Sequence, residues 1–118
     1  MATKLSDLKQ LFRYGNYGSV MEDDQGYRYY ISLRQKGIHR LHKTGEYGIS
    51  SSIVKEMLVK WKVDVVVLVL EDESRVIFTE ADNYANFGTT RQFEGYDEQI
   101  FVPESLFVTQ HTPWKSPW

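Results

Sequence analysis

Basic side chains gather in one stretch of this sequence, and they are the residues best suited to a chemical role. Between Arg28 and Lys43 the chain has five basic residues and no acidic one, whereas the remainder carries nine basic against sixteen acidic residues. Guanidinium groups bind phosphates in a bidentate manner, and a tyrosine ring offers a stacking face to an unpaired base. The composition therefore predicts a positive region on a negative body, suited to contact with nucleic acid.

Alternation within this stretch predicts a β-hairpin over residues 27–43. In its first strand, Arg28, Tyr30 and Arg34 fall on one face. The expected nucleic-acid-binding residues are Arg28, Tyr30, Arg34, Lys36, His39, Arg40, His42 and Lys43. An alternative is an adaptor or inhibitor that binds an acidic protein partner with the same patch.

The carboxylates and histidines form no evident catalytic or metal-binding pattern. His39 and His42 would face opposite sides of a strand, and the chain has no cysteine. We therefore predict a non-enzymatic protein with no catalytic residue, metal ligand or cofactor. A metal-dependent nuclease is the second alternative, in which Asp24, Asp64 or the turn Glu71–Glu73 would hold the ion.

The elements that must position these residues centre on residues 49–70. Ile53, Met57 and Trp61 recur at helical spacing after Ser50, which is placed to be the N-cap. The apolar run Val65–Leu70 follows directly. Such a run predicts a strand that is covered on both faces and lies near the centre of its sheet.

Weaker patterns flank this core. Helical spacing predicts short helices over Lys4–Tyr14 and Thr79–Phe87, with Thr79 as the cap of the second. Further predicted strands are Ser19–Glu22, Arg75–Phe78 and a last strand, Gln99–Val102. Residues 44–48 and 89–96 are expected to be loops.

Together these elements predict an α+β fold: an antiparallel β-meander, a crossover helix, a β-hairpin with the central apolar strand, and short flanking helices. The order helix, three strands, helix, strand resembles the αβββαβ core of PD-(D/E)XK nucleases, which is the alternative architecture. That resemblance implies an acidic residue near the second strand, where Asp23 or Asp24 stands. It also implies Glu-x-Lys on the third, but the third strand here reads Ile-His-Arg-Leu-His-Lys.

The chain length predicts one domain over residues 1–110, followed by a tail over 111–118. Trp114 and Trp118 in this tail are candidate anchors for a protein partner, or alternatively a cover for an exposed sheet face. The N-terminus lacks the apolar core of a signal peptide, and no apolar run is long enough to span a membrane. We therefore expect a cytoplasmic protein that does not bind membranes, whose edge strands are compatible with a homodimer.

Overall fold

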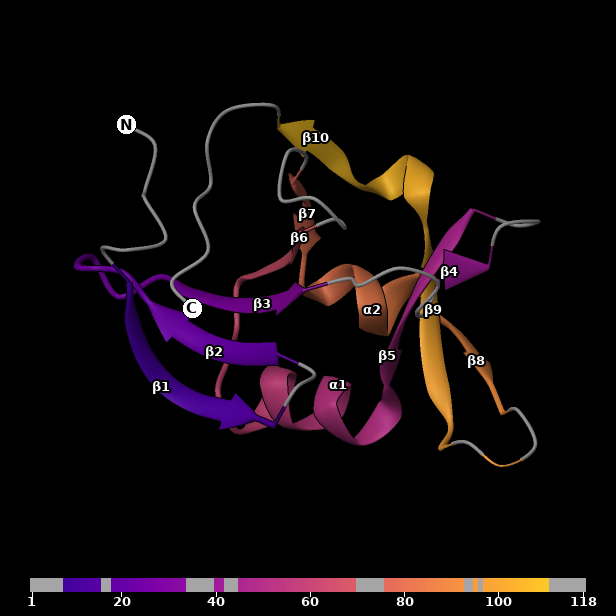
Figure 1. The fold of residues 1–118 in the computed structure, drawn as a ribbon, viewed down its shortest axis with the longest axis horizontal. Coiled ribbons are helices and arrows are strands. Elements are labelled where there is room, and N and C mark those ends of the chain that lie inside the picture. Colours follow the sequence, from indigo (N-terminus) through magenta and orange to yellow (C-terminus); the bar gives the residue numbers. More distant parts are fainter. Residues whose placement is uncertain are drawn as a thin grey trace.

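The structure is a computed structural model that describes residues 8–15, 18–33, 40–41, 45–69, 76–92, 95 and 97–110. For residues 33, 40, 41, 109 and 110 it describes the backbone alone. Within these ranges the chain forms two β-sheets and two α-helices, so the α+β prediction is confirmed (Figure 1).

The larger sheet has six strands in the order β1-β2-β3-β6-β7-β10. Their bounds are β1 Lys9–Tyr14, β2 Gly18–Glu22, β3 Arg28–Leu33, β6 Val65–Val69, β7 Val76–Glu80 and β10 Val108–Gln110. β1, β2 and β3 form an antiparallel meander. Its β2–β3 pairing and the hairpin of β6 and β7 were predicted, whereas the predicted third strand of the meander lay after β3 rather than before β2. β3 and β6 run parallel, so the chain between them is a crossover.

This crossover contains part of the second sheet and the longer helix. The second sheet has the order β4-β5-β9-β8. The bounds are β4 Arg40–Leu41, β5 Glu46–Ser50, β8 Thr89–Arg91 and β9 Gln99–Pro103. Helix α1 spans Ser51–Val59, helix α2 spans Asp82–Asn86, and a 3-10 turn, η2, spans Glu104–Leu106.

Strand β6 confirms the expectation of a central, doubly covered strand. It lies between β3 and β7, and its side chains enter two different apolar clusters. Val66 and Leu68 face the main core, whereas Val67 and Val69 face a smaller cluster on the other side of the sheet. The continuous valine run is what a strand with two buried faces requires.

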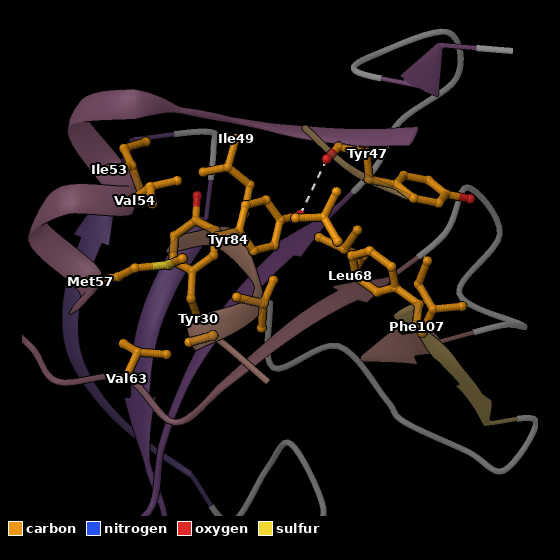
Figure 2. Packing of buried hydrophobic residues seen from close by; sticks show 14 of the residues in the cluster. Tyr30, Tyr47, Ile49, Ile53, Val54, Met57, Val63, Leu68, Tyr84 and Phe107 are labelled. Carbon is orange, nitrogen blue, oxygen red and sulfur yellow. Dashed lines mark hydrogen bonds between the residues drawn. The ribbon is translucent and has the colours of Figure 1, made fainter. Parts of the chain in front are cut away.

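The main core joins both sheets to α1 (Figure 2). Ile53, Val54 and Met57 from α1 belong to the same cluster as Tyr30 of β3 and Tyr47 of β5. In Figure 2, Tyr84 lies between the α1 side chains and Tyr47. Ser50 is the N-cap as expected, although its hydroxyl makes no capping hydrogen bond. The predicted apolar face of α1 is therefore correct, and it holds the two sheets together.

The N-terminal helix predicted over residues 4–14 is wrong where the structure describes the chain. Residues 9–14 form the edge strand β1, which pairs with β2. The register shifts between Gln10 and Phe12, so that Leu11 is the extra residue of a bulge. A bulge interrupts the two-residue alternation, which explains why this strand has helix-like spacing in the sequence.

Three further expectations about the elements are corrected. Residues 46–48 and 89–91, which were expected to be loops, lie in strands β5 and β8, and β10 follows β9, which was expected to be the last strand. α2 begins only at Asp82; Thr79 lies in β7, where its hydroxyl donates to the Leu106 carbonyl at 2.8 Å. The alternative αβββαβ order is also wrong. The first described element is a strand, and the strands are divided between two separate sheets.

The outer edge of β1 bears on the homodimer prediction. Lys9 and Arg13 are exposed on this strand, and the bulge at Leu11 lies between them. Charged residues and bulges are features with which natural proteins limit pairing between edge strands. A homodimer stays a prediction, and the β1 edge is not where we expect it to form.

The turn between β2 and β3 is organised by Asp23. Its Oδ1 accepts hydrogen bonds from the backbone N–H groups of Gln25 and Tyr27, both at 2.9 Å, and its Oδ2 accepts one from the Tyr29 hydroxyl at 3.0 Å. Desolvation raises the pKa of this carboxyl, but the hydrogen bonds outweigh it and hold the pKa below the usual 3.8. The ionised form of Asp23 therefore stabilises the folded state.

We expect Asp23→Ala to lower the free energy of unfolding at pH 7 by an amount that stays constant down to about pH 5. Because the folded-state pKa is depressed, the stabilisation is present above the unfolded-state pKa and is lost as the pH falls through the folded-state pKa. Urea denaturation of both proteins between pH 7 and pH 2.5 measures this. A difference that widens on acidification would contradict it, and Asp24→Ala is the control, because Asp24 makes no side-chain hydrogen bond in the described chain.

Candidate nucleic-acid interface

The predicted basic hairpin over residues 27–43 does not form. β3 already has β2 on one side and β6 on the other, so neither of its edges is available to a returning strand. β4, which contains Arg40 and Leu41, instead pairs with β5 in the second sheet. The structure thus separates Arg40 from Arg28, and Figure 1 shows β4 at the opposite end of the molecule from β1.

Arg28 is held in place by structural contacts. Its Nε lies 3.0 Å from Oε2 of Glu22 in an ion pair, and its NH1 donates to the Trp61 carbonyl at 2.7 Å. The guanidinium is partly buried. Arg28 therefore links β2 and β3 to the end of α1. Because its guanidinium already contacts Glu22 and the Trp61 carbonyl, it is poorly placed to bind a phosphate.

Tyr30 is not a surface residue, so its expected stacking role is corrected. Only 1% of Tyr30 is exposed, and its ring lies in the main core 6.2 Å from the ring of Tyr14. The neighbouring Ile31 is also buried, on the opposite face of the strand. Because both faces of β3 are covered, alternation could not distinguish an inner from an outer face.

Several predicted site residues lie outside the described residues. These are Arg34, Lys36, His39, His42 and Lys43, the side chain of Arg40, the turn Glu71–Glu73, and Trp114 and Trp118 of the tail. Their roles stay predictions.

Asp64 has a backbone role in the described chain. Its Oδ2 accepts the Arg28 N–H at 3.0 Å, its N–H donates to the Arg28 carbonyl at 2.8 Å, and its own carbonyl accepts the Ala81 N–H at 3.0 Å. Asp64 therefore sets the start of the parallel β3–β6 pairing. Among the described residues, no three His, Asp or Glu side chains are grouped so that they could hold a metal ion.

An exposed aromatic cluster, which the sequence interpretation missed, lies where β1 crosses the end of α1. We call Phe12, Tyr14 and Trp61 the aromatic platform. The rings of Phe12 and Trp61 are stacked, with centroids 5.4 Å apart and planes inclined by 29°. Phe12 also meets Tyr14 edge to face at 4.7 Å. Phe12 is 40% exposed although its ring packs on two other rings.

Hydrogen bonds to Glu56 and between Tyr14 and Trp61 hold the platform in place. The Tyr14 hydroxyl donates to Oε1 of Glu56 at 2.7 Å and accepts the indole N–H of Trp61 at 2.9 Å. Desolvation and the hydrogen bond to Glu56 raise the pKa of Tyr14, so the phenol stays protonated at neutral pH. Because Arg28 also holds the Trp61 carbonyl, both the indole and the backbone of Trp61 are constrained.

One cation lies close to the rings of this platform, and a second belongs to the same face of the sheet. Lys60 Nζ lies 5.1 Å from the ring centroid of Trp61 and 5.8 Å from that of Phe12. Lys9, Phe12 and Tyr14 pair with alternate residues of β2, so all three side chains belong to the same face of the sheet. Arg13 pairs with Ser19 and belongs to the opposite face.

The charges of these residues are not neutralised in the described chain. Arg28 and Arg91 form ion pairs with Glu22 and Glu46. The other cations whose side chains are described form none; they are Lys9, Arg13, Lys55, Lys60 and Lys62, all on β1, on α1 or just after it. Two acidic residues near the platform, Glu56 and Asp64, each already accept a hydrogen bond. Lys9, Lys60 and Lys62 therefore have no ion-pair partner among the described residues, although the carboxylates of Glu56 and Asp64 lie near the platform.

Lys62 has an unfavourable backbone conformation. Its φ is 50°, and no other non-glycine residue in the described ranges has a positive φ. Glycine is the usual residue at such a position after a helix, because a Cβ is disfavoured there. Strained residues of this kind cluster at functional sites, so a lysine here is consistent with a use for its charge.

We expect Lys62→Gly to raise the free energy of unfolding by about 0.5–1 kcal/mol, because relief of the left-handed strain exceeds the added flexibility of the unfolded chain. Lys60→Gly is the matched control: Lys60 has a right-handed backbone, so glycine should destabilise the protein there. Urea denaturation measures both changes. If Lys62→Gly is destabilising, the strain argument is wrong.

The sequence did contain a signal for this surface. Leu-Phe-Arg-Tyr in β1 and Lys-Trp-Lys after α1 both place aromatic residues beside cations. These two segments are about 50 residues apart in the chain, and only the fold brings them together.

In the part of the chain that the structure describes, no helix is long and apolar enough to cross a membrane. Comparison of the chain with protein-family models, with curated proteins and with solved structures found no match.

Proposed function

We propose that this protein is a small non-enzymatic binding protein that contacts nucleic acid with the face formed by β1 and the end of α1. The observation that carries the proposal is the exposed Phe12 ring, stacked on Trp61 with the Lys60 ammonium group near both rings. Proteins that bind nucleic acid without strong sequence preference combine such stacking rings with cations that follow the backbone.

The distribution of charge supports the same face. Lys9 and Lys60 lie beside the platform, and Lys62 directly follows Trp61 in the chain. The net charge of −2 makes general attraction to a polyanion weak, so binding has to depend on a local cluster of cations. The basic residues between Arg34 and Lys43 stay a separate prediction for a second contact.

The chain has no cysteine, which suits a reducing compartment, and we propose the cytoplasm as the place where it acts. An acidic protein partner is the second candidate. It is favoured by Val59, which is 69% exposed beside Lys60 and would add apolar area to such a contact.

A salt titration tests the proposal. The affinity of the protein for a fluorescein-labelled 20-nucleotide single strand is measured by fluorescence anisotropy between about 50 and 300 mM NaCl. If Lys9, Lys60 and Lys62 each contact one phosphate, log Kd should rise with log salt with a slope of about 2. An affinity that does not change across this range, or the absence of binding at the lowest salt, would refute nucleic-acid binding; binding of an acidic polypeptide instead would favour the second candidate.

A further inference from the structure

We infer that the bound strand is single-stranded and that one of its unpaired bases stacks on Phe12. This inference rests on the proposed function and specifies its ligand. In a duplex each base is already stacked between neighbours and paired at its edge, so a ring on the protein surface gains little contact with it. An unpaired base has a free π face, and every base type has one.

The exposure of Phe12 differs from that of the other exposed aromatic residues. Phe87 is 60% exposed, yet neither an aromatic ring nor a cation contacts its ring in the described chain. Phe12, in contrast, is held by two rings and has an ammonium group nearby. A base stacked on Phe12 would therefore extend an existing stack and place its phosphate close to a positive charge.

Hydrogen bonds orient the platform residues before any ligand binds. Trp61 is constrained through its indole N–H by Tyr14 and through its carbonyl by Arg28, and Tyr14 is constrained by Glu56. Ordering side chains on binding has an entropic cost, which a preformed stack avoids. The network from Glu56 to Trp61 thus has a functional consequence, because it keeps the Phe12 ring in one position at the surface.

Lys60 and Lys62 supply the backbone contact for the stacked nucleotide. Lys60 Nζ lies 5.1 Å from the ring centroid of Trp61, and Lys62 is the exposed residue that follows Trp61 in the chain. Alternating aromatic and cationic groups match the alternation of base and phosphate along a single strand.

The test is a double-mutant cycle between the protein and the oligonucleotide. A labelled 12-nucleotide thymidine strand is compared with the same strand containing abasic sites, using the wild-type protein and Phe12→Ala. We expect the wild-type protein to bind the strand with bases about tenfold more tightly than the abasic strand, and Phe12→Ala to lose this preference. Phe12→Leu, which keeps apolar bulk without a π face, should lose most of the preference too, and Phe87→Ala should keep it.

The result is interpretable whether or not Phe12→Ala perturbs folding. Circular dichroism melting shows whether each variant is folded. If Phe12→Ala is unfolded, Phe12→Leu replaces it in the cycle. Equal affinity of the wild-type protein for single strand and duplex, or an unchanged base preference in Phe12→Leu, would overturn the stacking inference while leaving nucleic-acid binding in place. If the wild-type protein binds no strand at all, the proposed function fails as well.

Discussion

Replacing Lys9, Lys60 and Lys62 together by Gln is expected to lower the affinity for a single strand about 100-fold at 0.1 M salt. Each phosphate contact on a single strand contributes roughly 0.7 log units to the salt slope, which at 0.1 M salt is about fivefold in affinity per contact. Three contacts therefore give about two orders of magnitude, and the slope should fall by about 2. Fluorescence anisotropy with the 20-nucleotide strand measures both quantities.

A matched control separates these three positions from general charge effects. Arg13 is exposed on β1 but lies on the other face of the sheet, and Lys55 is exposed on α1 about 140° around the helix from Lys60. The double variant Arg13→Gln, Lys55→Gln should change the affinity by less than about threefold. If the control variant loses as much affinity per charge as the triple variant, binding is diffuse and does not centre on the platform.

Tyr30→Ala is expected to lower the free energy of unfolding by about 3–5 kcal/mol, because it removes a large ring that is 1% exposed in the main core. Tyr30→Phe keeps the ring and should cost no more than about 1.5 kcal/mol. Urea or thermal denaturation measures both values.

The same two variants decide between a core role and a binding role for Tyr30. The sequence interpretation gave Tyr30 a stacking function, whereas its burial predicts that Tyr30→Phe binds nucleic acid as the wild type does. If Tyr30→Ala is as stable as the wild type and binds nucleic acid more weakly, the placement of this residue in the core is wrong.

Elements with long, regular patterns could be predicted from the sequence. α1 has an apolar stripe and a recognisable N-terminus, and the valine run of β6 is too apolar for a strand with a solvent face. The pairing of β2 with β3 and the hairpin of β6 and β7 followed from turn residues and alternation. These features are local, so a single sequence contains the information for them.

The errors arose where tertiary packing overrides a local pattern. The bulge at Leu11 gives β1 a helix-like spacing. Gly48 suggested a loop, yet it lies in β5, where a Cβ would collide with the Phe101 ring of the neighbouring strand. Tyr30 was assigned to an outer face that does not exist, since both faces of β3 are covered.

For the candidate site, the types of residue could be predicted from the sequence, but their location could not. The sequence predicted that cations and aromatic rings contact nucleic acid, but it located them in the basic stretch that ends at Lys43. The platform depends on contacts between Tyr14 and Trp61, and between Phe12 and Trp61, which only the crossover between β3 and β6 brings together. Such long-range pairs leave no periodic trace in the sequence.

The most direct test of the binding face is NMR spectroscopy of the ¹⁵N-labelled protein titrated with a single-stranded oligonucleotide. The indole N–H of Trp61, identified among the three tryptophans by Trp61→Phe, and the amides of Phe12, Lys60 and Lys62 should show the largest shifts. Amides of α2, β8 and β9 should be unaffected. Shifts confined to those elements, with the Trp61 indole signal unchanged at saturation, would contradict the account.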